Sequence, residues 1–169
     1  RKYAVTIKTS MLDRILLLLT GLLAAWQIAV GIDQLSTLPI VAYTVGFGVL
    51  LVAALLLLIL GLEVLDSPLV VIASTIIPLS LSLGLVWDHL PVYRTVYLAF
   101  TMAGFLAIVI TRSIPIKNRL PVILLACVHG VAGMIIFLLP IIETIKGISH
   151  PAFALVGVGG ALIGVGGLL

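Results

Sequence analysis

The charged residues of this sequence are confined to the gaps between long apolar segments. Its six Asp and Glu and nine Lys and Arg residues fall in short clusters. The stretches between the clusters approach or exceed the roughly 20 residues that a helix needs to cross a bilayer core about 30 Å thick. Six membrane-spanning segments are predicted, at about 11–32, 39–62, 68–87, 92–111, 120–142 and 151–169. We therefore predict an all-α, polytopic integral membrane protein with about six transmembrane helices.

Composition excludes the other broad classes of protein. Of the 169 residues, 63% are hydrophobic and 9% are charged, whereas soluble domains carry about 25% charged residues. Disordered chains need low hydrophobicity and high charge, which is the opposite pattern. Amides are few and Ile, Leu and Val are many, which is typical of a thermophilic source.

Helix-start signals support these six segments. Ser10 and Asp13 form a capping-box pattern, and Ser67-Pro68 places a cap directly before a proline. Similar pairs of a polar residue and a proline stand at the starts of the second, fifth and sixth segments: Thr37 and Pro39, Asn118 and Pro121, and His150 and Pro151. Proline suits the first turn because its missing N–H would find no partner there.

The distribution of positive charge predicts the orientation. An internal N-terminus places seven of the nine basic residues on the inner side, and only Arg94 and Lys146 outside. Such a bias is typical of cytoplasmic loops, so we expect both ends of this chain on the cytoplasmic side of a plasma (inner) membrane. The inner basic residues are Arg1, Lys2, Lys8, Arg14, Arg112, Lys117 and Arg119.

The domain organisation is predicted to be simple. Residues 1–9 alternate polar and apolar, so we expect 1–10 to lie along the membrane interface; pairing as a short strand is the alternative. Residues 11–169 are expected to form a single six-helix domain. Because 169 lies inside an apolar run, we expect the domain to be truncated at its C-terminus. Segments 14–87 and 94–169 share an order of Arg, Pro and acidic residues, which suggests a 3+3 inverted repeat. The alternative is that any six-helix chain with prolines at helix starts shows this order.

Three histidines are the candidate cofactor-binding residues. His129 is expected at mid-depth in the fifth segment, where it is a candidate haem ligand, quinone partner or proton relay. A hydrogen bond between helices is the structural alternative. His89 and His150 are expected at one membrane level, where two imidazoles can form a haem-binding pair; two solvated histidines are the alternative. Haem and quinone are thus the possible cofactors, and bound lipid is expected. No metal ligands or catalytic residues are predicted.

The third segment is the candidate transport path or ligand cleft. Its central Pro78 is expected to kink the helix, and four hydroxyl side chains surround that proline: Ser74, Thr75, Ser80 and Ser82. The same hydroxyls would also suit a purely structural helix by satisfying backbone groups. Gln27 and Gln34, at the outer end of the first segment, are expected to face this helix and add amide donors.

The sixth segment is predicted to be a packing helix. Gly160 with Gly164, and Gly157 with Ala161, form pairs of small residues four apart, which allow another helix to approach closely. The partner is another helix of this chain, a second copy or a different subunit. Four aromatic residues are assigned to the outer interface as anchors: Trp26, Trp87, Tyr93 and Tyr97.

These features favour a non-catalytic membrane subunit of a larger complex, such as an electron-transfer assembly. A small-solute or ion transporter or channel, using the third helix, is the first alternative, and a haem- or quinone-binding subunit is the second. Six short spans with small loops resemble the hydrophobic accessory subunits of respiratory complexes and the small substrate-binding membrane subunits of vitamin transporters. An enzyme of lipids is disfavoured because the sequence holds no acid–base constellation. Expected partners are the bilayer and other membrane subunits or a second copy, and no nucleic acid.

Overall fold

The structure is a computed structural model that describes residues 9–32 and 35–166, and its described elements are all helical. The expected interfacial segment falls almost entirely on residues outside these ranges. The main helices are α1 (Met11–Val30), α2 (Thr37–Leu60), α3 (Pro68–His89), α4 (Arg94–Ser113), α5 (Leu120–Ile145) and α6 (Ala154–Gly166). Three short 3-10 turns, η1 (Leu62–Asp66), η2 (Pro91–Tyr93) and η3 (Pro151–Phe153), precede α3, α4 and α6.

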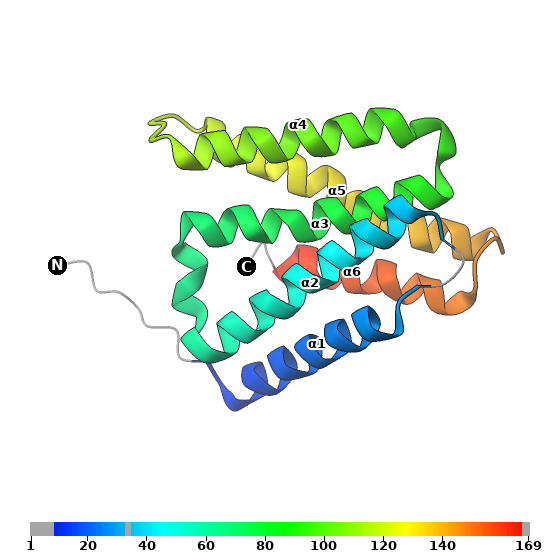
Figure 1. The fold of residues 1–169 in the computed structure, drawn as a ribbon, viewed down its shortest axis with the longest axis horizontal. Helices are drawn as coiled ribbons and strands as arrows, with labels where there is room; N and C mark the ends of the chain where they lie inside the picture. Colours follow the sequence, from blue (N-terminus) through cyan, green and yellow to red (C-terminus); the bar gives the residue numbers. More distant parts are fainter. Residues whose placement is uncertain (1–8, 33–34, 167–169) are drawn as a thin grey trace.

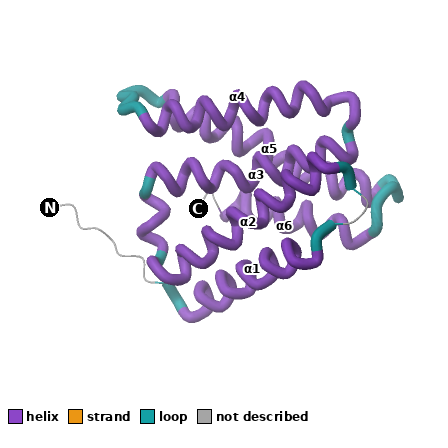
Figure 2. The backbone as a smooth tube through the Cα atoms, in the orientation of Figure 1, coloured by secondary structure: helices purple, strands orange, loops and turns teal. Residues whose placement is uncertain are grey.

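Consecutive helices run in opposite directions and form an antiparallel bundle (Figures 1 and 2). The α2–α3 and α4–α5 connections lie at one end of the bundle, and the α1–α2, α3–α4 and α5–α6 connections lie at the other (Figure 1). We call the second end, which carries Asp88, His89, Arg94, Glu143 and Lys146, the Arg94 end. The opposite end carries Arg14, Arg112, Lys117 and Arg119 in the described ranges.

Five helices, α1 to α5, are long and apolar enough to cross a membrane. The sixth apolar helix covers Pro151–Val165 and is shorter than the other five within the described ranges. Membrane integration through at least these five helices is therefore consistent with their length and composition. A sixth complete span stays a prediction.

Local start signals act at some of the predicted helix starts. Ser67 stands at the N-cap of α3 but makes no side-chain cap bond, and Ser36 rather than Thr37 is the N-cap of α2. The Ser10 hydroxyl accepts the backbone N–H of Asp13 at 3.1 Å, and the Asp13 carboxylate accepts the N–H of Ser10 at 2.7 Å. Both halves of the predicted capping box are thus present. Asn118 accepts the N–H of Leu120 at 3.0 Å at the start of α5. That helix runs on to Ile145, beyond the expected end at 142, and so includes Glu143.

Helix α3 lies at the centre of the bundle and packs against α2, α4 and α5. It is the most buried of the five long helices. Its Leu79 joins Ile108 of α4 and Val128 and Ala132 of α5 in one core cluster. Every fourth or third residue of α4 is buried along one stripe, which gives the helix a single inner face. The stripe is Tyr97, Thr101, Gly104, Ile108 and Thr111.

The contacts between helices do not show the symmetry of an inverted repeat. If α1–α3 were related to α4–α6 by a two-fold axis, the contact between α3 and α5 would require one between α6 and α2. Within the described ranges, α6 packs against α5 and the η3 turn, and α1 packs against α2 alone. The repeat therefore stays a prediction that the packing does not support.

Two glycines of α6, Gly157 and Gly160, pack against another helix of this chain. A Cβ atom at Gly157 would lie 2.5 Å from the Phe137 carbonyl oxygen, and one at Gly160 would lie 2.8 Å from Ile136 Cγ2. The partner of this part of the glycine face is thus α5 of the same chain. A Cβ atom at Gly164 would meet nothing within 4 Å, so the expected Gly160–Gly164 pair is not used as one unit.

We expect Gly157→Ala to loosen the contact between α5 and α6. The added methyl group overlaps a backbone oxygen that cannot move aside, and such overpacking costs about 1–3 kcal/mol. Gly159→Ala is the matched control, because a Cβ atom there meets nothing within 4 Å. The measurement is the thermal midpoint in detergent, followed by size exclusion after heating. Equal midpoints for the two variants would show that the α5–α6 packing is wrong.

Candidate functional site

Polar residues from α3 and α5 meet at the Arg94 end of the bundle. His89, the last residue of α3, places its Nδ1 3.4 Å from Oε2 of Glu143 in the last turns of α5. Glu143 is only 8% exposed. The His89 ring also stacks on Phe153 of η3, with ring centroids 5.1 Å apart. A carboxylate this buried needs a polar partner, and the imidazole of His89 supplies it.

A second polar contact links α2 to the neighbouring residue of α3. The Tyr43 hydroxyl donates to Oδ2 of Asp88 over 3.5 Å, which is a long hydrogen bond. The Tyr43 ring also lies directly against Gly84, where any Cβ atom would overlap it. Glycine at position 84 therefore allows the aromatic ring to reach the end of α3.

Arg94 closes the turn between α3 and α4. Its Nε donates to the Trp87 carbonyl oxygen at 2.6 Å, and its guanidinium carbon lies 5.5 Å from the centre of the Trp87 ring. These contacts join a cation–π interaction to a charge-assisted hydrogen bond. Arg94 thus fixes the turn rather than presenting a free positive charge to a ligand.

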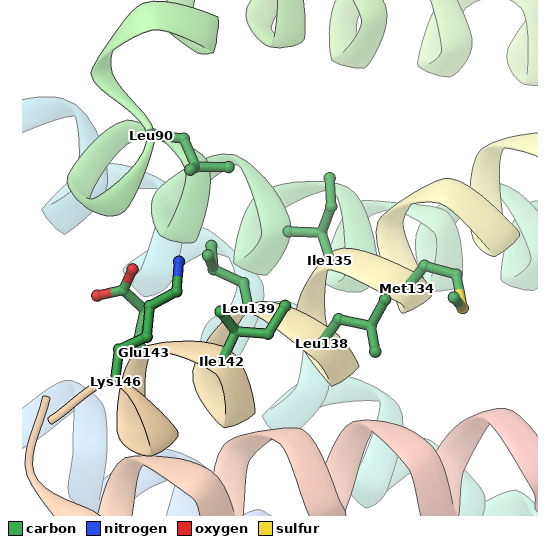
Figure 3. A pocket seen from close by; sticks show the side chains of 8 residues that line it. All are labelled: Leu90, Met134, Ile135, Leu138, Leu139, Ile142, Glu143 and Lys146. Carbon is green, nitrogen blue, oxygen red and sulfur yellow. The ribbon is translucent and has the colours of Figure 1, made fainter. Parts of the chain in front are cut away.

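A groove of about 370 Å³ opens beside this polar cluster (Figure 3). Its walls come from Leu90, after α3, and from both exposed and buried residues of α5, and most of them are apolar. The polar side chains Glu143 and Lys146 stand together at one end of the groove, away from Met134 and Leu138 (Figure 3). The full lining is Leu90, Met134, Ile135, Leu138, Leu139, Ile142, Glu143 and Lys146.

Three hydroxyl side chains of α3 donate hydrogen bonds to backbone carbonyl oxygens of the same helix. Thr75 and Ser82 are fully buried, and they donate to the carbonyl oxygens of Val71 at 2.8 Å and Pro78 at 2.6 Å. Ser74 also donates to Val71, at 3.0 Å. None of these three bonds goes to the Ser74 carbonyl that Pro78 leaves without its helical donor.

The same hydroxyls point toward different neighbours. The Tyr97 hydroxyl of α4 donates to Ser82 at 2.7 Å, whereas Ser80 lies beside Gly46 of α2. Because Ser80 and Ser82 face different helices, they do not line one common path. Their contacts describe a tightly packed central helix, and a transport path along α3 stays a prediction.

The remaining residues of the expected cleft do not gather at α3. Gln27 donates from Nε2 to the Gly31 carbonyl at 3.1 Å, and α1 packs against α2 alone among the described elements. Helix α1 thus makes no packing contact with α3 among the described elements, and an outer cleft that includes Gln27 stays a prediction. Gln34 lies outside the described residues.

The three histidines occupy separate environments. His129 is half-buried on α5, and its Nδ1 lies 3.1 Å from the Leu125 carbonyl of the same helix. His150 is exposed, and its Nδ1 accepts the Ala152 N–H at 3.2 Å at the start of η3. No ring contact or hydrogen bond joins His89 to His150 in the part of the chain that is described. A bis-histidine haem site stays a prediction that these contacts do not favour.

The four predicted aromatic anchors lie in different environments. Trp26 and Tyr93 are exposed, as interfacial anchors should be, and Trp87 is half-buried with the Arg94 guanidinium over its ring. Tyr97 is only 8% exposed and bonds Ser82 inside the bundle, so its assignment as an anchor is wrong. The sequence does not distinguish an exposed anchor such as Tyr93 from a buried residue such as Tyr97, because the two tyrosines lie only one helical turn apart and so near the same membrane level.

Two residues of the polar cluster, Glu143 and Tyr43, are not site candidates from the sequence. Glu143 was placed beyond the fifth span, although its position one turn before Lys146 is compatible with a longer helix. Tyr43 carries no signal except its place among apolar residues near the start of α2. Only the packing of α2 on α3 brings its hydroxyl to Asp88.

The described residues contain no group of three or more His, Cys, Asp or Glu side chains that could hold a metal ion. Comparisons of the chain with protein-family models, with curated proteins and with solved structures found no match. Inference about function therefore rests on the contacts themselves.

We expect His89→Ala to destabilise the Arg94 end of the bundle. It would leave the buried Glu143 carboxylate without the imidazole, and an unsatisfied buried polar group costs about 1–3 kcal/mol. His89→Asn is the control, because it keeps a side-chain amide close to the position of Nδ1. The midpoint of unfolding in detergent should fall for the alanine variant and recover, at least in part, for asparagine. Three indistinguishable midpoints would show that the His89–Glu143 contact contributes nothing.

Proposed function

We propose that this chain is a non-catalytic membrane subunit that packs against other membrane helices in a larger assembly. The observation that supports the proposal is an open strip of small residues on α5. Ala126, Gly130 and Gly133 recur at spacings of four and three, and so share one face of the helix. A Cβ atom at Gly130 or Gly133 would meet nothing within 4 Å.

Other glycines of this chain are covered by a neighbouring helix, whereas those of the α5 strip are not. Gly157 and Gly160 of α6 lie against backbone and side-chain atoms of α5, and Gly46 of α2 lies against Leu81 of α3. In lipid, helix association depends on close van der Waals contact, which small residues permit. The strip on α5 has the same composition, but none of the residues that the structure describes comes within 4 Å of a Cβ atom at Gly130 or Gly133.

The internal polar groups favour a packing role over a transport role. Ser82 and Thr75 are buried and bonded to backbone oxygens, and the groove at the Arg94 end is nearly all apolar. Transporters place polar or broken-helix sites near the midplane for their substrates.

The charge distribution supports an orientation with the Arg94 end outside and both ends of this sequence inside.

A haem- or quinone-binding subunit is the second candidate, and His129 favours it. Its Nδ1 lies near the backbone of its own helix, and the adjacent Gly130 leaves space on the exposed side of α5. The ring is then oriented with Nε2 as the nitrogen available to a haem iron or a quinone oxygen. A dithionite-reduced minus oxidised spectrum of the native assembly tests this candidate, which requires a band that His129→Ala abolishes.

We expect Gly130→Leu to release the chain from its assembly. A leucine side chain holds the approaching helix away from the strip and removes the close contact. Gly159→Leu on α6 is the control, because that glycine stands alone on its helix face between Leu155 and Ile163. The measurement is the native mass, and the co-purifying subunits, of protein extracted gently from its own membrane.

The two variants distinguish assembly from folding. The proposal expects a loss of native mass for Gly130→Leu with an unchanged thermal midpoint, and an intact assembly for Gly159→Leu. An intact assembly with Gly130→Leu, or a wild-type chain that is monomeric in mild detergent, would refute it.

A further inference from the structure

The groove at the Arg94 end opens toward the surrounding bilayer. Met134, Leu138 and Ile142 of α5 line it, and their side chains are 53%, 38% and 41% exposed. These three residues recur every fourth position and form a continuous apolar wall along the helix. In a membrane, the medium that reaches such a wall is the hydrocarbon of lipid chains.

The length of the groove matches one leaflet of a bilayer. From Met134 to Lys146 the lining follows twelve residue steps of α5, which at about 1.5 Å each is about 18 Å. Half of a hydrocarbon core about 30 Å thick is about 15 Å. An extended chain of one leaflet therefore fits along the groove from the interface toward the midplane.

The polar end of the groove suits a phosphate group. Lys146 is exposed and forms no ion pair with the described residues. Glu143 lines the same end of the groove, but it is buried and its Oε2 lies 3.4 Å from His89 Nδ1, so its carboxylate already has a partner. Lys146 also follows directly after Ile145, the last residue of α5, which puts its ammonium at the interface. A lysine at that level attracts the phosphate of a lipid headgroup.

We propose that this groove binds one phospholipid of the adjacent leaflet, with one acyl chain along Met134, Leu138 and Ile142 and its phosphate on Lys146. The lipid completes the surface of α5 beyond the strip of small residues. This site adjoins the strip of the proposed assembly at Gly133 and Met134, but it rests on different residues, so Lys146→Gln and Gly130→Leu test the two proposals separately. It also differs from the expected haem or quinone sites, which rest on histidines.

Native mass spectrometry of delipidated protein in mild detergent tests the proposal. The probes are dioleoylphosphatidylglycerol, dioleoylglycerol, which has the same chains without phosphate, and glycerol phosphate, which has no chains. We expect the wild-type chain to retain one phosphatidylglycerol and to hold the other two probes far more weakly. Retention should need both parts of the lipid, because the groove offers an apolar wall and one ammonium.

Two pairs of variants locate the site. Lys146→Gln should weaken retention about fivefold, since one lysine near a lipid headgroup contributes about 1 kcal/mol. Lys117→Gln, at the opposite end of the bundle, should retain the lipid. Leu138→Trp should fill the groove and abolish retention, whereas Ile163→Trp, on an exposed position of α6, should not.

Several results would overturn the proposal. They are no retained lipid on the wild-type chain, equal retention by all four variants, or equal retention of dioleoylglycerol. A co-purifying quinone that phosphatidylglycerol fails to displace would assign the groove to a different ligand. If Leu138→Trp fails to fold, judged by its thermal midpoint, Lys146→Gln and the three probes decide the question alone.

Discussion

Burial of α3 by three neighbouring helices is the constraint on which the rest of the bundle depends. This helix packs against α2, α4 and α5, so each of its sides must suit a different neighbour. Gly84 admits the Tyr43 ring from α2, and Ser82 receives the Tyr97 hydroxyl from α4. Leu79 joins the core shared with α4 and α5. The outer helices α1 and α6 then attach through α2 and α5 rather than through α3.

The polar groups of the bundle follow from the same constraint. A buried hydroxyl in hydrocarbon is stabilised by an acceptor, and the nearest acceptors are carbonyl oxygens one turn earlier in its own helix. Thr75, Ser82 and Thr111 use such carbonyls, whereas the buried hydroxyl of Thr101 has no partner among the described residues. Charged groups remain at the ends, where Arg94 holds its turn and His89 accompanies Glu143. Little polarity is left over at the midplane for a substrate.

Helix α5 divides into two functional halves under these proposals. Its N-terminal half presents the small residues of the proposed subunit contact, and its C-terminal half forms one wall of the lipid groove. The two surfaces need different partners, because a bare backbone admits another helix, whereas a groove with a lysine at one end suits a lipid with its phosphate. The two proposed partners account for the change along the exposed side of α5 from small residues to large apolar residues with a lysine at the end.

The sequence by itself determined the class of protein, most helix boundaries and the separation of charge between the two ends. Partition between water and hydrocarbon acts residue by residue, and caps such as Ser10 with Asp13 are local, so both can be read along the chain. Only the tertiary structure decided which small faces are filled, that Tyr97 is buried, and that α1 packs on α2 and not on α3. It also brought Glu143 to His89. The physical reason is that an apolar helix face is as stable against lipid chains as against another apolar helix, so hydrophobicity does not select the neighbour. The choice of neighbour therefore depends on steric fit between helices, which no linear pattern records.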